Sequence, residues 1–135
     1  MKVTPAAETV SKPANPDYFV GQVWQEPIVT TPGEPPVMML KVLFTPGGRT
    51  NWHTHPAGQT LYVLEGEGRI QRRGGPVERL MPGDTVWIEP GEEHWHGAAP
   101  GRVMAHIAMQ RMVDGRGADW LEPVAEADYT AEPAG

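Results

Sequence analysis

Two histidines and a glutamine close together in the sequence have the types and spacing of metal ligands. His53 and His55 are two residues apart, and successive side chains of an extended strand point to opposite faces, so both imidazoles are expected on one side. After the turn at 56–58, Gln59 opens a second strand and can offer its side-chain oxygen to the same point. Imidazole nitrogens with one oxygen suit a divalent transition metal, so the sequence predicts a metal centre.

The other three histidines fall at positions that can face the same centre. His94 and His96 form a second His-x-His pair with same-face parity, and His94 is the fourth candidate ligand. In the long apolar stretch 102–112, parity places His106 and Gln110 together on one face, while the opposite face is more uniformly apolar. His106 and Gln110 are therefore expected to line the cavity that holds the metal.

Short strands are the elements that must position these side chains. After a loop at 32–36, Pro-Gly pairs occur at 46–47, 82–83, 90–91 and 100–101. Each pair is a turn signal that separates segments of strand length. The expected strands are 18–24, 37–45, 50–55, 59–65, 69–73, 77–80, 85–89, 94–96 and 102–112. The seven from 50–55 onward, or eight with 37–45, predict by their spacing an all-β sandwich or barrel.

The chain length of 135 residues fits one domain. Residues 1–16 are rich in Pro, Ala, Thr and Lys without periodicity and are expected to form a flexible arm, so the folded domain is assigned to 17–135. Only the stretch 122–129 has a mildly helical pattern, which predicts a short C-terminal helical segment.

Composition restricts the class of partner. The formal net charge is −6, and the only adjacent basic pair is Arg72-Arg73, so the basic face that nucleic acids require is missing. Cysteine is absent, which excludes disulfides and thiolate metal sites. No apolar run approaches the roughly 20 residues of a membrane helix. We expect a cytoplasmic protein with a small-molecule substrate and neither nucleic-acid nor membrane partners.

The spacing of these residues resembles the two motifs of the cupin family. The first motif reads Gly-x5-His-x-His-x3(4)-Glu-x6-Gly, and the second reads Gly-x5-Pro-x-Gly-x2-His-x3-Asn. The matching positions here are Gly47, His53, His55, Gln59 and Gly66, then Gly83, Gly91 and His94. This resemblance spans residues 37–112 and implies a single-domain double-stranded β-helix, or jelly-roll barrel.

Three positions depart from the cupin motifs. Gln59 stands where the family has an acidic ligand, Glu89 stands for the usual proline, and Ala98 stands for the terminal asparagine. An amide in place of a carboxylate leaves every ligand neutral, so a bound metal keeps its full 2+ charge toward open coordination positions. Such a site is expected to bind metal less tightly and to attract anions more strongly.

A finer resemblance is to small bacterial cupins that include manganese-dependent hydroxynitrile lyases. It rests on the sequences at 52–60, 82–87 and 90–100, and on a late Asp-Gly-x3-Asp-Trp at 114–120. The implied metal ligands are His53, His55, Gln59 and His94. The resemblance further implies that Thr50, His96 and His106 line the substrate site, and parity adds Gln110 as a substrate contact.

The resulting hypothesis is a lyase that reversibly cleaves a cyanohydrin to an aldehyde and cyanide. His96 and His106 are the expected catalytic residues, since an imidazole with an ordinary pKa near 6.5 can accept and return the hydroxyl proton. Manganese is the expected metal, with iron, nickel and zinc as alternatives, and a homodimer or homotetramer is the expected assembly. Two other functions remain open: an iron-dependent dioxygenase, and a non-catalytic barrel that binds a small ligand.

Overall fold

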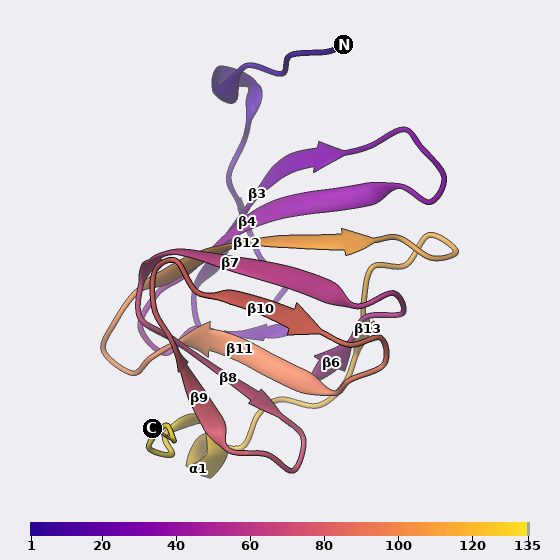
Figure 1. The fold of residues 1–135 in the computed structure, drawn as a ribbon. Coiled ribbons are helices and arrows are strands. Elements are labelled where there is room, and N and C mark those ends of the chain that lie inside the picture. The colour runs from indigo at the N-terminus through magenta and orange to yellow at the C-terminus, as the bar shows by residue number, and fades with distance from the viewer. Residues whose placement is uncertain (135) are drawn as a thin grey trace.

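Strands predominate in the computed structural model, which describes residues 1–134 (Figure 1). The strands are β1 (Lys12–Pro13), β2 (Phe19–Val20), β3 (Val23–Thr30), β4 (Val37–Phe44), β5 (Arg49–Thr50), β6 (His53–Thr54), β7 (Gln59–Gly66), β8 (Gly68–Arg72), β9 (Val77–Leu80), β10 (Thr85–Ile88), β11 (His94–Ala98), β12 (Met104–Arg111) and β13 (Asp119–Trp120). The helices are a 3-10 turn, η1 (Ala6–Glu8), and a single α-helical turn, α1 (Glu126–Tyr129). The expected all-β fold with a short C-terminal helical segment is confirmed.

Two antiparallel sheets form the two layers of the barrel. The larger sheet has the strand order β1-β3-β4-β12-β7-β10, and the other runs β13-β6-β11-β5-β2, with the β8–β9 hairpin joined to β11. All the strand pairs are antiparallel, and β12 lies between β4 and β7 in the middle of the larger sheet. Strands β6, β7, β11 and β12 carry all but one of the candidate ligands and catalytic histidines, and residues of all four strands line one cavity.

Glycines allow the chain to turn tightly between these strands. Gly91, after Pro90, has a φ of +75°, a conformation that residues with a side chain rarely adopt. Gly66 has a φ of +81°, and a Cβ there would lie 1.9 Å from the carbonyl oxygen of Val103. The close approach between the end of β7 and the start of β12 therefore requires glycine at position 66.

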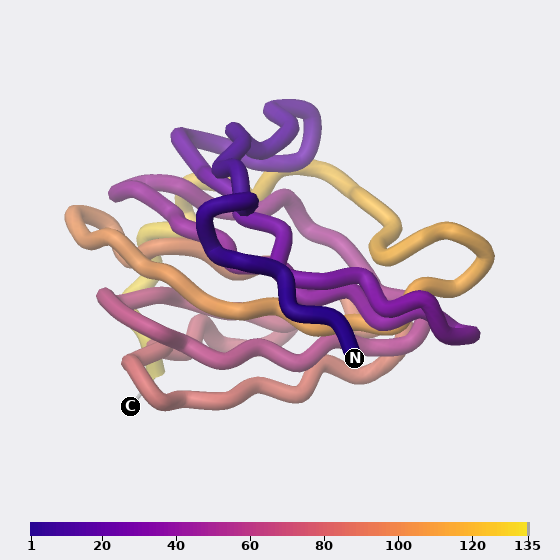
Figure 2. Tube along the Cα trace, turned by 90° about the horizontal axis from the view of Figure 1, so that it is seen from above, coloured from indigo at the N-terminus to yellow at the C-terminus, as the bar shows by residue number. Residues whose placement is uncertain are grey.

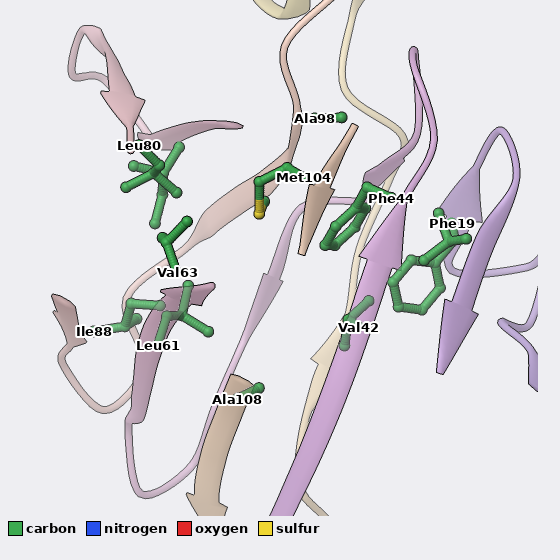
Figure 3. Packing of buried hydrophobic residues seen from close by; sticks show 12 residues of the cluster. Phe19, Val42, Phe44, Leu61, Val63, Leu80, Ile88, Ala98, Met104 and Ala108 are labelled. Carbon is green, nitrogen blue, oxygen red and sulfur yellow. The ribbon is translucent and has the colours of Figure 1, made fainter. Parts of the chain in front are cut away.

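Apolar side chains fill the interior on one side of the histidines. Figure 3 shows Phe19, Phe44 and Met104 between the strands, with Leu61 and Ile88 further along the same core. Phe44, Leu61 and Met104 are completely buried. The core thus forms a packed apolar layer beside the polar site.

A second apolar cluster lies on the outer face of the β11 sheet. Its buried members are Trp52, Val77, Trp95, Val124 and Tyr129. Two of these residues come from the C-terminal segment, which Figure 1 shows folding back beside β8 and β9. The C-terminal residues therefore cover the sheet on the face opposite to the histidines.

Two expected strands each prove to be two. The predicted strand 18–24 is divided at Gly21 and Gln22 into β2 and β3, which belong to different sheets. The sequence also predicts a continuous strand over 50–55, whereas the structure has β5 and β6 with a break at Asn51 and Trp52. This second break has a cause, because the Asn51 side-chain amide donates to the carbonyl oxygens of Asp17 and Leu121 and ties three segments together. Both single-strand predictions were wrong, although His53 still faces the interior.

The N-terminal residues extend away from the barrel (Figures 1 and 2). All of residues 1–12 are exposed, but Lys12 and Pro13 pair with Gln25 and Trp24 at the edge of the larger sheet. Within residues 1–134, no helix has the length and apolar character needed to span a membrane.

Candidate metal centre

Adjacent strands of one sheet bring three histidines together. His53 on β6 and His94 on β11 are direct cross-strand partners, and their ring centroids are 4.2 Å apart. Alternation along β11 turns His96 to the same face as His94, with the two rings nearly parallel at 5.6 Å. All three side chains are buried, and each offers a ring nitrogen within 4.8 Å of the other two.

His55 lies at the edge of this cluster. Its ring centroid is 4.9 Å from that of His53 and 5.3 Å from that of His94. By ring nitrogens, the three that all lie within 4.8 Å of one another are His53, His94 and His96, whereas the sequence predicts His53, His55 and His94 with Gln59. By ring centroids, His96 is the more distant ring, at 5.3 Å from His53 and 5.6 Å from His94. Both sets contain His53 and His94 and suggest a metal site, so they differ in whether His55 or His96 is the third imidazole.

Hydrogen bonds to backbone carbonyls orient the three predicted imidazole ligands. The Nδ1 atoms of His53, His55 and His94 lie 2.9, 2.7 and 2.9 Å from the carbonyl oxygens of Asn51, Gly117 and Glu92. A carbonyl oxygen can only accept, so each Nδ1 must carry the proton and each neutral ring keeps its lone pair on Nε2. This pairing of one ring nitrogen with a carbonyl is typical of metal-binding histidines.

His96 has a different partner from the other members of the cluster. Its Nδ1 lies 3.0 Å from Nε2 of His106, and its backbone N–H donates to the hydroxyl oxygen of Thr50 at 3.2 Å. With no carbonyl to fix its tautomer, His96 is paired for proton exchange with another imidazole. This difference favours the predicted ligand set and leaves His96 and His106 as a separate buried pair.

Gln59 presents its oxygen to the same region. Its Nε2 donates to Oε1 of Gln110 at 2.8 Å, while its own Oε1 is buried and has no hydrogen-bond partner among residues 1–134. Nε2 of His55 and Nε2 of His94 are likewise buried without a partner in the described part of the chain. A buried polar atom left unpaired costs about 1–3 kcal/mol, so these atoms fit a bound cation that would accept their lone pairs.

Burial keeps the histidines neutral at pH 7. Desolvation lowers the pKa of His94 to about 4, and it lowers the pKa of His106 to about 4 as well. Desolvation, with added repulsion from neighbouring histidines, puts the pKa values of His53 and His96 well below 6.5. Burial also lowers the pKa of His55, and the bond to Gly117 partly opposes this. A neutral imidazole can bind a metal without first losing a proton.

A small cavity of about 60 Å³ opens beside the histidines. It is lined by Phe19, Gln25, Leu40, Val42, Phe44, Thr50, His53, His55, Gln59, His96, His106, Ala108, Gln110, Ala118 and Trp120. Thr50 and Gln110, the predicted substrate contacts, are both in this lining. Of the lining residues described, none is an Asp, Glu, Lys or Arg, so the cavity has a neutral, largely apolar wall with polar groups on one side.

The sequence did not identify part of the cavity wall. Trp120 stacks on the His53 ring at 4.6 Å, and Tyr18 also stacks on Trp120 at 4.8 Å. Trp120 and Gly117 belong to residues 113–122, here called the C-terminal strap, which crosses the open end of the site. The Asp-Trp at 119–120 was a usable signal for Trp120, but nothing in the sequence marks the carbonyl of Gly117.

Comparisons with known proteins agree with this fold. A protein-family model described as a cupin domain matches residues 40–109. The (R)-mandelonitrile lyase of Granulicella tundricola is 50% identical over 113 residues, which are 84% of this chain and 86% of the relative. An acireductone dioxygenase of Trichormus variabilis is 33% identical over 79 residues, which are 56% of this chain and 41% of that protein. A cupin-like protein from Thermotoga maritima superposes with a TM-score of 0.82 at 42% identity, covering 87% of this chain and 89% of the other.

Proposed function

Because this chain belongs to the cupin family, we propose that it is a metal-dependent hydroxynitrile lyase that splits a small cyanohydrin reversibly into an aldehyde and cyanide. The proposed ligands are His53, His55, Gln59 and His94. When bound there, a divalent metal supplies Lewis acidity toward the hydroxyl oxygen or an attractive charge for cyanide. Manganese is the proposed metal.

The observation that carries the proposal is the pairing of His96 with His106 in an uncharged cavity. Their mutual hydrogen bond uses one nitrogen of each ring, and the other two nitrogens have no partner in residues 1–134. Whichever ring donates in the shared bond, the two remaining nitrogens are one lone pair and one N–H. The pair therefore offers a base and an acid at the same time.

Cyanohydrin cleavage needs both of these groups. The free lone pair of the histidine pair takes the hydroxyl proton, the O–H electrons form the carbonyl, and the carbon–carbon bond breaks with its electrons leaving on cyanide. The imidazole N–H then protonates the cyanide, so that aldehyde and hydrogen cyanide leave. General acid–base groups of this kind typically contribute about 10²–10⁴ in rate.

The cavity wall favours a neutral, apolar substrate. Phe44, Val42 and Trp120 offer aromatic and aliphatic contacts, and a carboxylate or phosphate would find no fixed cation among the lining side chains described. Thr50 and Gln110 are the proposed polar contacts to the substrate. An aromatic cyanohydrin such as mandelonitrile meets these requirements.

The test is elemental analysis of protein purified without chelator, followed by cyanide release from mandelonitrile under anaerobic conditions. We expect near-stoichiometric metal and release well above a His53→Ala control. His106→Ala should keep its metal and lose about 10²–10⁴ in kcat. Glu126→Gln, a change at an exposed side chain on α1, should match the unmodified protein.

Two results would reject the proposal. Bound metal without cyanide release, combined with oxygen consumption, would move the assignment to a dioxygenase, for which the partial match to acireductone dioxygenase is the supporting observation. Failure to bind metal even after reconstitution would leave only a ligand-binding barrel.

A further inference from the structure

An amide ligand has a problem of orientation that a carboxylate does not. The two ends of the Gln59 side chain have nearly the same size, but only the oxygen end has a lone pair for a metal. If the amide turns over, its NH2 can donate to the free Nε2 of His55. Gln59 would then use up the lone pair with which His55 is proposed to bind the metal. Something other than shape must hold the oxygen toward the histidines.

Gln110 is placed to do this. Met109 on β12 is paired with Thr60 on β7, and the antiparallel register brings the next residue, Gln110, beside Gln59. Both side chains are buried, with 8% of Gln110 and 4% of Gln59 exposed. Oε1 of Gln110 accepts the Gln59 amide proton at 2.8 Å, so turning Gln59 over would set two acceptor oxygens against each other.

The C-terminal strap lies against the other end of the Gln110 amide. A Cβ added to Gly117 would lie only 3.0 Å from Nε2 of Gln110, so the absence of a side chain at 117 leaves room for that NH2 end. The carbonyl of the same glycine accepts from Nδ1 of His55. Gly117 thus contacts both of the side chains that flank Gln59.

We propose that Gln110 is a positioning residue, which fixes the Gln59 amide with its oxygen toward the metal site and its NH2 away from the histidines. Gln110 acts through Gln59, in addition to any contact it makes with substrate. This inference rests on the metal-dependent function proposed above. It also explains how the chain accommodates an amide at the position where cupins usually have a carboxylate, whose two oxygens need no such control.

The test measures Mn²⁺ affinity by competition with a chelator, using protein that has been stripped of metal. Gln110→Met has similar length but no acceptor, and we expect about 10–100-fold weaker binding. Gln110→Glu restores an acceptor oxygen and should bind within about threefold of the original or more tightly. Met109→Leu, on the outward face of the same strand, is the matched control and should leave affinity unchanged.

A second measurement separates orientation from general damage to the site. In a Gln59→Glu background both oxygens of residue 59 can bind the metal, so orientation no longer matters. Adding Gln110→Met should therefore cost much less Mn²⁺ affinity than it does beside Gln59. Equal losses in the two backgrounds, or equal losses for Gln110→Met and Gln110→Glu, would overturn the proposal. The unfolding midpoint of each metal-free variant confirms that the fold is retained.

The outcomes also separate this inference from the proposed function. If the unmodified protein binds Mn²⁺ and releases cyanide while Gln110→Met binds Mn²⁺ equally well, only the role of Gln110 is rejected. If the unmodified protein binds no Mn²⁺, both proposals fail together.

Discussion

The two faces of β11 differ in whether their buried side-chain nitrogens have hydrogen-bond partners. On the outer face, Trp95 is completely buried and its indole N–H donates to Oε1 of Gln71 at 2.8 Å. On the inner face, His94 and His96 are equally buried, yet each keeps an Nε2 without a hydrogen-bond partner in residues 1–134. Neighbouring residues of one strand therefore lie in environments built to different requirements.

The difference shows that alternate residues of β11 have different roles. Those on the outer face stabilise the fold, and those on the inner face provide groups for chemistry. The outer face satisfies its polar groups and buries large aromatic side chains, which stabilises the fold. The inner face leaves imidazole nitrogens unpaired, and each such buried atom costs about 1–3 kcal/mol of stability. Changes at alternate positions of one strand should consequently separate into two kinds of effect.

The largest effect is expected on the inner face. His94→Ala should reduce the metal content to about one tenth or less and lower cyanide release at least about 100-fold, because one of the four proposed ligands is lost. The free energy of unfolding of the metal-free protein should change little. The lost packing is offset because a buried nitrogen without a hydrogen-bond partner is also removed. Elemental analysis, the cyanide assay and urea denaturation measure the three quantities. Retention of full metal content would place the site elsewhere.

Trp95→Ala should show the reverse pattern. Removing this fully buried side chain leaves a cavity and should lower the free energy of unfolding by about 3–5 kcal/mol, measured by urea denaturation. The folded fraction should still bind metal with unchanged stoichiometry. Trp95→Phe, which keeps most of the volume, provides a milder variant if the alanine protein does not fold. A loss of metal binding greater than the loss of folded protein would contradict the separation of the two faces.

Acidification should act on the inner face through its buried histidines. The pKa of His106 is about 4 in the fold against 6.5 when unfolded, so between these values the unfolded chain binds more protons. Stability of the metal-free protein should therefore fall as the pH drops from 6.5 to 4, by about 3 kcal/mol from His106. Urea denaturation at several pH values should show a shallower decline for His106→Leu. Equal slopes for the two proteins would contradict this account.

The smallest effect concerns one hydrogen bond on the outer face. The Tyr129 hydroxyl donates to the carbonyl oxygen of Ala98, and the Arg49 guanidinium lies over the Tyr129 ring at 4.1 Å. Tyr129→Phe keeps the ring and should cost only about 1 kcal/mol in the free energy of unfolding. Mn²⁺ affinity should stay the same, and a measurable change in it would show that the two faces are coupled.

Local patterns in the sequence predicted most of the fold. Pro-Gly turns and alternation located the strands closely, and β9 occupies the expected 77–80. The break between β5 and β6 could not be read in this way, because it depends on bonds from Asn51 to segments 34 and 70 residues away. Turn signals are local, whereas such contacts exist only once the chain has folded.

The candidate site was predictable to a similar extent. Same-face parity brought His53, His94 and His96 together, and His106 and Gln110 line the cavity as expected. The sequence did not predict the partner of each ring, since a backbone carbonyl such as that of Gly117 has no residue type to mark it. It also did not predict that Gln110 would bond to Gln59, because parity gives a face but no side-chain conformation.

The C-terminal strap has a consequence for how the protein is made. Ribosomes synthesise chains from the N-terminus, so the last of the four proposed ligands, His94, is translated before Gly117 and Trp120. Until the strap docks, His55 lacks the carbonyl that fixes its proton on Nδ1 and His53 lacks its stacking indole. All five histidines are thus present in the growing chain before the residues that fix two of them.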